Sequence, residues 1–283
     1  MLFRSLTLPG NRAQWAKLPP FENLKGNIRI TENNPEFEDV SANFLGGAIR
    51  ISNDKKNKNN QIFDIAGDIK TSFIKDYFAH TAGTEIRSLL NAMNGSIKYD
   101  GSINFNKLGS ESNLQFDLNN WSLNAPAPAK KLAGTPLKGE INIKTFSNNK
   151  TNSNRAIWSG KIGDLYSLQG TLNRDDEMSQ SLGIGAQPNL PKQGFNLNLV
   201  SSELNFDAWQ EFFNAKKAPQ EPAIDLASSN IQVTAQIKKL IAYHLQWPDV
   251  NAVINHKNDL VDLRLSSHLA SGDRKSTRLN SSH

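Results

Sequence analysis

Cysteine is absent from the 283 residues, so no disulfide holds this fold together. Long apolar runs are missing as well, since nothing approaches the roughly 20 consecutive apolar residues that a membrane-spanning helix needs. The first residues, MLFR, lack the apolar core of a signal peptide. We therefore expect either a cytosolic protein or a piece of a longer one.

Apolar residues are scarce throughout the chain. They make up 37% of the sequence, which is low for a compact globular protein, and asparagine and serine are abundant. An extended single-layer sheet with one wet face has this composition, and so does a loop-rich protein. The same scarcity leaves too few apolar residues to fill a second sheet layer.

The formal net charge is +5, which invites a nucleic-acid interpretation. Three of the basic residues, however, lie in the last eleven positions (Arg274, Lys275 and Arg278). The remaining lysines fall in predicted loops, so no basic face is expected. The pattern indicates no nucleic-acid partner.

The two ends of the chain lack strand periodicity. Residues 1–20 end in Pro19-Pro20, and we interpret them as a connecting segment. Residues 273–283 read DRKSTRLNSSH, which resembles the translation of a sequencing adapter. We expect this artefactual tail to be disordered and the chain to be a fragment of a larger protein, with its folded region at 21–272.

The stretch 93–143 carries the clearest structural signal, because apolar and polar residues alternate along it. A period of two is typical of strands with one apolar and one wet face. Asp100-Gly101 is predicted to form a two-residue turn. The proline-rich segment 124–136 is predicted to be a connection outside the ladder, because proline cannot donate to a sheet.

From this alternation we predict a mainly β protein, a long antiparallel sheet with a few short helices. The apolar members of the alternating strands are expected to line one continuous concave surface. These candidate residues are Ile97, Tyr99, Ile103, Phe105, Leu114, Phe116, Leu118, Ile141, Ile143, Leu197 and Leu199.

Residues 205–214 form the clearest predicted helix. Asn205 is its expected N-cap, and Asp207 favours the helix dipole in the first turn. Phe206, Trp209 and Phe213 share one side, so we expect them to bury against the sheet. Ser72 and Thr84 are expected to begin two further short helices.

No constellation of catalytic, metal-binding or cofactor-binding residues is found. His244, His256 and His268 lie at intervals without metal-ligand logic. The acidic cluster 175–177 reads as a solvated hairpin turn. Gly183 and Gly185 precede no predicted helix, so they make no dinucleotide loop. We expect a protein that is not an enzyme and needs no cofactor.

Three segments carry a resemblance to a known family. They are 118–137 (LNNWSLNAPAPAKKLAGTPL), 183–209 and 247–272, in this order. Over 21–272 the chain resembles the central to C-terminal region of the YhdP-type members of the AsmA-like proteins of Gram-negative envelopes. The Asn- and Lys-rich loops are bulkier than is typical of that family.

The resemblance implies a long sheet curled into a U-shaped groove in the periplasm, anchored at one end in the inner membrane by a segment missing here. It also implies that phospholipid acyl chains bind in the groove on their way to the outer membrane. The alternative is a β-rich extracytoplasmic binding or adhesin-like module. That module would have two polar sheet faces or a dry stacked core, in place of an open apolar trough.

Overall fold

The computed structural model describes most of the chain. The described residues are 4–14, 19–30, 35–53, 61–78, 84–106, 109–148, 153–172, 177–215, 230–257, 260–268 and 271–277. They divide into two compact units. Unit 1 comprises residues 1–82, 90–122 and 131–156, and unit 2 comprises residues 83–89, 123–130 and 157–283. The fold is mainly β with three short helices in the described part, as predicted.

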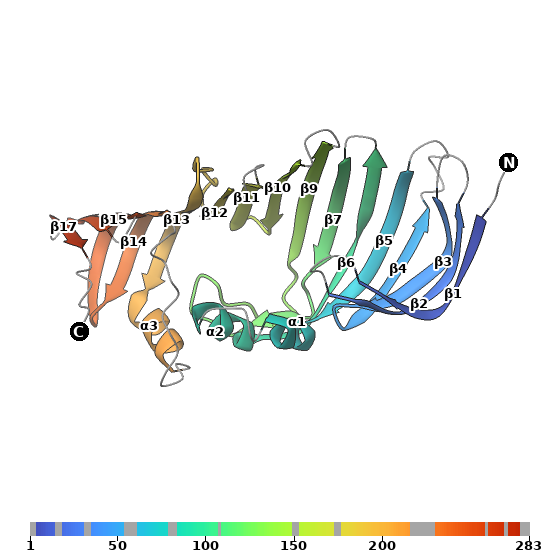
Figure 1. The fold of residues 1–283 in the computed structure, drawn as a ribbon. Helices are drawn as coiled ribbons and strands as arrows, with labels where there is room; N and C mark the ends of the chain where they lie inside the picture. The colour runs from blue at the N-terminus through green and yellow to red at the C-terminus, as the bar shows by residue number, and fades with distance from the viewer. Residues whose placement is uncertain are drawn as a thin grey trace, which may run out of the picture. The chain divides into compact units, whose positions relative to one another are not determined.

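Unit 1 consists of strands that follow one another along the chain (Figure 1). They are β1 (Arg4–Ala13), β2 (Phe21–Ile30), β3 (Pro35–Phe44), β4 (Gly47–Asn53), β5 (Gln61–Lys70), β6 (Met93–Asn106), β7 (Gly109–Asp117), β8 (Trp121–Leu123) and β9 (Lys138–Asn148). Helix α1 (Thr71–Phe78) directly follows β5. Helix α2 (Thr84–Ala92) and strand β10 (Ser153–Ile162) are divided between the units.

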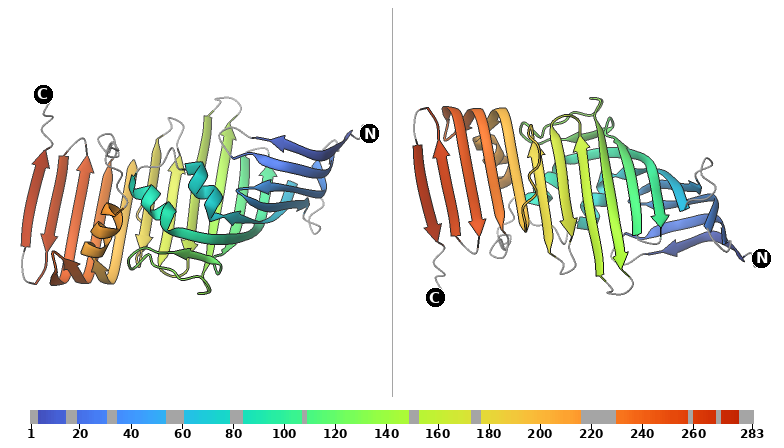
Figure 2. Two further views of the ribbon diagram at one scale, coloured as in Figure 1. Left: turned by 90° about the horizontal axis from the view of Figure 1, so that it is seen from below. Right: turned by 90° about the horizontal axis from the view of Figure 1, so that it is seen from above.

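The unit 1 strands pair antiparallel in chain order from β1 to β7, and β9 then pairs with β7. The short connection between β3 and β4 explains their pairing, because a tight hairpin can only bring the next strand back antiparallel. The connection from β5 to β6 is longer and contains α1 and α2. Within this unit the strand direction turns progressively from β9 to β1, so the sheet is curled (Figures 1 and 2).

The predicted turn at Asp100-Gly101 is wrong. Both residues lie inside the uninterrupted strand β6, where Gly101 pairs with Ile65 of β5 and with Leu114 of β7. A Cβ atom at position 101 would lie only 2.0 Å from the carbonyl oxygen of Asn113. The glycine therefore permits a close backbone approach between neighbouring strands, and no chain reversal is needed.

The prediction that residues 1–20 merely connect is wrong for Arg4–Ala13. This segment is strand β1, which pairs with β2 from Arg4–Ile30 to Ala13–Phe21 through two register irregularities. These irregularities break the period of two, and that is why the segment does not read as a strand. Residues 1–3 and 15–18 lie outside the described part.

A β-bulge in β3 changes which side chains face the apolar side. Between Lys25–Ser41 and Asn27–Glu38 the register shifts, and Asp39 has a φ of 50°. A Cβ atom at Gly26 would lie 2.7 Å from the Asp39 carbonyl oxygen, so only glycine fits opposite the bulge. Beyond the bulge the ring of Phe37 meets that of Phe63, with centroids 4.7 Å apart.

Unit 2 contains the remaining elements (Figure 1). They are β11 (Tyr166–Leu172), β12 (Met178–Ile184), β13 (Gly194–Asn205), α3 (Phe206–Asn214), β14 (Ile231–Ala242), β15 (Leu245–Lys257), β16 (Leu260–Ser266) and β17 (Ser271–Thr277). Each strand again pairs with the next in chain order. The pairs β12–β13 and β13–β14 are parallel, which corrects the expectation of a wholly antiparallel sheet.

The connection between β12 and β13 explains the first parallel pair. Parallel pairing requires a connection that returns the chain to the end of the sheet where β12 began. This connection runs over the polar side of both strands. Ser179 Oγ donates to the Lys192 carbonyl at 2.8 Å, and Asn196 Nδ2 donates to the Asn189 carbonyl at 2.8 Å. The amide of Asn189 in turn donates to Ser181 Oγ at 2.9 Å. These hydrogen bonds pair the buried hydroxyls of Ser179 and Ser181 and the Nδ2 of Asn196, whereas Asn196 Oδ1 is buried without a partner among the described residues.

Helix α3 lies in the second parallel connection. Its predicted N-cap is confirmed, because Asn205 Oδ1 accepts the Ala208 amide at 2.9 Å. The Asp207 carboxylate accepts the backbone amides of Tyr243 and His244 at 2.7 and 2.8 Å, and these bonds lower its pKa. Both turn residues have positive φ angles of 55° and 60°. Asp207 therefore holds the β14–β15 turn.

The aromatic residues of α3 are less buried than predicted. No residue of α3 is fully buried, and Phe206 is 44% exposed. Trp209 packs on Phe212 and Phe213, and its Nε1 donates to the Ala127 carbonyl at 2.9 Å. The helix lies over a single face of the unit 2 sheet, in front of the strands in one view and behind them in the other (Figure 2). Its aromatic side chains pack largely on one another.

The expectation that residues 273–283 are disordered is wrong for their first part. Ser271–Thr277 forms β17, which pairs with β16 from Ser266–Ser271 to Leu260–Thr277. An edge strand offers a row of backbone donors and acceptors to any extended segment, whatever its side chains. The polar sequence is therefore compatible with pairing. Residues 278–283 lie outside the described part.

We predict that Asn196→Ala destabilises unit 2 by about 1–3 kcal/mol, because a buried carbonyl in the crossover loses its donor. Asn196 is 2% exposed. Denaturant unfolding followed by circular dichroism measures the change. The matched control is Gln236→Ala, at an exposed position of β14. This substitution should change the free energy of unfolding by less than about 0.5 kcal/mol. Equal effects of the two substitutions would contradict the role given to Asn196.

Candidate functional site: the apolar face of the sheet

The strand register gathers nine of the candidate residues on one face of unit 1. Along β6 the odd positions share a side, and Tyr99 lies opposite Phe116 of β7. Leu114 lies opposite Ile141 of β9, and Leu118 follows β7 with its amide bonded to the Leu137 carbonyl at 2.9 Å. The nine are Ile97, Tyr99, Ile103, Phe105, Leu114, Phe116, Leu118, Ile141 and Ile143. We call this side the apolar face of unit 1.

The apolar face extends over strands that the candidate list does not include. In β5, Ile69 and Phe63 lie opposite Ile97 and Ile103. Ile51 of β4 lies opposite Ile65 of β5, and further residues of β2 to β4 pack in the same cluster. The signal for these residues was present in the sequence, because the segment 61–70 alternates in the same way.

The opposite side of the same strands is polar. Lys98 and Asp100 of β6, Gln115 and Asp117 of β7 and Glu140 of β9 are all exposed. Each of them is the chain neighbour of a residue of the apolar face, so its side chain points to the other side of the strand. One layer of sheet therefore separates a water-facing surface from an apolar one.

The apolar face is only partly shielded from solvent. Ile97, Leu114, Phe116 and Ile141 are half-buried, and Phe105 is 46% exposed. All described strands of unit 1 belong to a single sheet, so within the described residues no second sheet of this unit packs on the face. In a β-sandwich the same residues would meet another sheet about 10 Å away and be dry. Part of the face is therefore exposed to solvent.

A row of aromatic rings crosses the apolar face along one end of the strands. Phe37 of β3 contacts Phe63 of β5 edge-on, and Phe63 contacts Phe105 of β6 with centroids 5.8 Å apart. These rings add apolar area without polar atoms, and they make contacts that have no preferred direction along an alkyl chain.

Tyr99 carries the one polar atom in the buried core of this face. The residue is 7% exposed, and its hydroxyl has no hydrogen-bond partner within the described part of the chain. Burial, with a smaller contribution from the nearby Asp68 carboxylate, raises the pKa of the Tyr99 phenol to about 12. Gly67 makes room for this ring, since a Cβ atom there would lie 2.7 Å from the hydroxyl oxygen.

The other two candidate residues, Leu197 and Leu199, lie on one side of the unit 2 sheet. Leu197 pairs with Leu182 and Val233, and Leu199 pairs with Ile184 and Ala235. Leu199 is 8% exposed and belongs to a core with Ile237 and Val250, whereas Leu197 is half-buried. Buried and half-buried apolar residues thus occur together on this side of unit 2, as they do on the apolar face of unit 1, where Val40 is 1% and Phe63 6% exposed.

The proline-rich connection predicted at 124–136 lies outside the strands, with one isolated bridge at Lys131. Two hydrogen bonds hold its first part, which belongs to unit 2. The Tyr166 hydroxyl donates to the Pro128 carbonyl at 2.9 Å, and Trp209 Nε1 donates to the neighbouring Ala127 carbonyl at 2.9 Å. Desolvation by this packing raises the pKa of Tyr166.

Across the described residues, no three side chains of His, Asp or Glu converge in a way that could hold a metal ion. None of the described helices has the length and apolar character to cross a bilayer.

A family profile described as "YhdP protein" matches residues 5–280. The chain belongs to the YhdP family. The match begins within β1 and ends beyond β17, and membership of this family implies a cell-envelope protein. No curated protein and no solved structure matches the chain.

We predict that Tyr99→Phe leaves stability at neutral pH almost unchanged, because the hydroxyl that it removes has no partner. In the unaltered chain the pKa of the Tyr99 phenol is higher in the folded state than the unfolded value of about 10. The contribution of the neutral phenol to the free energy of unfolding is therefore complete below pH 10. It is lost as the pH rises through about 12. Unfolding free energies measured between pH 8 and 12 should therefore fall less steeply for the variant.

The matched control is Tyr243→Phe, since Tyr243 is 75% exposed. This substitution should leave the pH dependence of stability as it is in the unaltered chain. A Tyr99→Phe profile that coincides with the unaltered one would show that the Tyr99 phenol is not buried.

Proposed function

We propose that this chain forms part of a non-enzymatic hydrophobic groove that carries phospholipid between the inner and outer membranes. The observation that supports the proposal is the apolar face of unit 1, which is half-exposed on a single-layer sheet whose other side is polar. Membership of the YhdP family supports the envelope setting. We place the groove in the periplasm, with an inner-membrane anchor outside the 283 residues.

The physical requirement for such a carrier is continuous apolar cover. An acyl chain of about 16 carbons has an unfavourable exposure free energy on the order of 10 kcal/mol, at about 0.8 kcal/mol for each methylene group. An aqueous gap is crossed only if the chain stays shielded along its path. Apolar contact is non-directional, so a lipid can slide over the face without any residue gripping it.

The dimensions of the face suit an acyl chain. At about 3.3 Å per residue, Ile97 to Phe105 along β6 spans about 26 Å. One leaflet of a bilayer with a hydrocarbon core of about 30 Å needs about 15 Å for its chains. A single strand length therefore covers one extended acyl chain, and neighbouring strands supply parallel tracks.

The first test is photo-crosslinking in cells that express the intact protein. A photoreactive amino acid at Phe116 or Ile103 should crosslink to lipid, because both positions lie on the apolar face. Gln115 and Asp117 are the matched controls, since they flank Phe116 and point to the polar side. Equal labelling of the two sets would overturn the groove and favour the β-rich binding module.

The second test is the substitution Phe116→Glu. Since Phe116 is half-buried on an unsealed face, the charge can reach water, and the fold should survive with lipid occupancy reduced at least fivefold. In a sealed core the same charge would unfold the domain. Circular dichroism and mass spectrometry of copurified lipid give the two readouts, with Gln115→Glu as the control. Unfolding of the Phe116 variant would contradict an open face.

A further inference from the structure

The apolar face of unit 1 changes from alkyl and aromatic groups to hydroxyl groups along β7. In order along β7 and the residue that follows it, read backwards, the side chains on this face are Leu118, Phe116, Leu114, Ser112 and Ser110. Both serines belong to the face, because Ser112 pairs with Ile103 of β6 and Ser110 pairs with Phe105. We call the two ends of this row the Leu118 end and the Ser110 end.

A pair of hydroxyl groups marks the Ser110 end. Ser110 Oγ and Thr145 Oγ1 lie 2.8 Å apart, and Thr145 Oγ1 also accepts the Ser110 amide at 3.1 Å. Thr145 of β9 is the register partner of Ser110, so its side chain lies on the same side of the sheet. A hydrogen bond between two hydroxyls uses one of their two hydrogens, so one O–H donor of the pair remains for a ligand.

Ser112 adds a second donor, inside the apolar surface. It lies between Ile103 of β6 and Ile143 of β9, one row from the pair at the Ser110 end. Two residues along a strand cover about 6.6 Å, so the donors are separated by about that distance. A molecule that covers this surface displaces water from Ser112, and the hydroxyl then needs an acceptor on that molecule.

Exposure to solvent changes in the same direction. Leu118 and Tyr99 are 5% and 7% exposed, whereas Phe105 beside Ser110 is 46% exposed. Helix α1 lies at the Leu118 end of the strands (Figure 1), where Thr71 Oγ1 donates to the Gly95 carbonyl at 2.9 Å. The face therefore has a dry apolar end and a wet end that carries hydrogen-bond donors.

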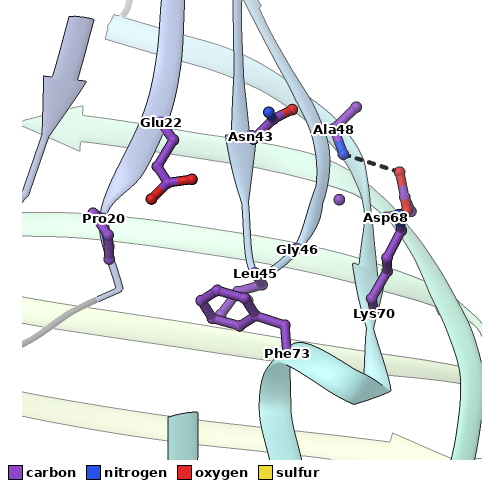
Figure 3. A pocket seen from close by; sticks show the side chains of 10 residues that line it. Pro20, Glu22, Asn43, Leu45, Gly46, Ala48, Asp68, Lys70 and Phe73 are labelled. Carbon is purple, nitrogen blue, oxygen red and sulfur yellow. Dashed lines mark hydrogen bonds between the residues drawn. The ribbon is translucent and has the colours of Figure 1, made fainter. Parts of the chain in front are cut away.

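Charged groups near the Leu118 end lie on the other side of the sheet. There a pocket of about 490 Å³ has Glu22, Asp68 and Lys70 in its lining (Figure 3). Asp68 Oδ1 accepts the Ala48 amide at 3.1 Å, as the dashed line shows, and Asp68 pairs with Lys98 of the polar side. A lipid whose tails lie on the apolar face does not reach these charges.

We propose that a phospholipid lies along β6, β7 and β9 in one orientation, with its tails towards Leu118 and its head group at the Ser110 end. Its ester and phosphate oxygens accept hydrogen bonds from the Ser110–Thr145 pair and from Ser112. This orientation rests on the proposed function and adds to it the part of the lipid that the chain recognises.

The donors are complementary to the linkage region of a phospholipid. Ester carbonyl and phosphate oxygens accept hydrogen bonds and have no hydrogen to donate, so they suit hydroxyl donors. From Ser112 to Leu118 the strand covers about 20 Å, which is enough for the tails of one leaflet at about 15 Å. The charged part of the head group stays in water, because the Ser110 end is exposed.

The test maps two photoreactive phosphatidylcholine probes on the whole chain. One probe carries a diazirine at the end of a tail, and the other carries it next to the glycerol ester. Mass spectrometry should place the tail probe at Phe116 and Leu118 and the ester probe at Phe105 and Thr145. The expected preference over the reverse placement is about fivefold, which corresponds to about 1 kcal/mol of hydrogen bonding.

The triple variant Ser110→Ala/Ser112→Ala/Thr145→Val removes the three hydroxyls. It should lose the preference and keep the total crosslinking, because the apolar area of the face is retained. The isosteric single variant Thr145→Val, checked by circular dichroism, should lower the preference in a folded chain. The matched control is Ser102→Ala, since Ser102 lies opposite Asn113 on the polar side, and it should leave the preference unchanged.

The possible failures are distinguishable. Even marking of both ends by each probe, or the reverse placement, would overturn the orientation while the groove stands. An unchanged preference in the folded hydroxyl variants would show that these groups do not recognise the lipid. If neither probe marks the apolar face, the proposed function itself fails.

A final arm uses an alkane of similar length with a diazirine at one end. This probe has no hydrogen-bond acceptor, so it should mark the two ends of the face evenly. If it shows the same preference as the phospholipid probes, the shape of the face orients the ligand, and the role given to the ester and phosphate oxygens is overturned.

Discussion

The hydrogen-bonded ladder of a single-layer sheet is the constraint on which this protein depends. Neighbouring strands satisfy each backbone group, so unit 1 needs no second layer to hold its strands in register. The pairs Tyr99–Phe116 and Leu114–Ile141 put apolar side chains on one side of every strand. A slip of one residue would turn Asp100 or Gln115 onto that side and expose the aromatic rings to water. Fold and candidate site are therefore specified by the same register.

The proposed function would depend on the area of the apolar face. Many side chains contribute small and interchangeable amounts to the contact, so no single residue is decisive. Movement of a lipid along the groove would then depend on the weak, uniform contact between its tails and this face.

Both units combine buried and exposed apolar side chains. In unit 2, Leu199, Ile237 and Val250 are nearly dry, whereas Leu245 is 57% exposed. In unit 1, Val40 and Ile49 are nearly dry, whereas Phe105 is 46% exposed. The units differ in topology, because the parallel strands belong to unit 2, where the crossover 185–193 buries Ser179 and Asn196 on the polar side.

The period of two was sufficient to predict the strands of 93–143 and to place nine candidate residues on one side, because alternation is a local property of a pleated chain. The Asn205 cap was likewise readable, since it depends on four adjacent residues. Other features depended on distant backbone. Asp100-Gly101 stays extended because β5 and β7 pair with it on both sides. The bulge at Asp39, opposite Gly26, adds one residue to β3 and shifts the alternation of its side chains by one position, so Phe37 lies on the apolar side. Parallel pairing of β12 to β14 and the position of β17 on the edge of β16 required three-dimensional neighbours that no local pattern encodes.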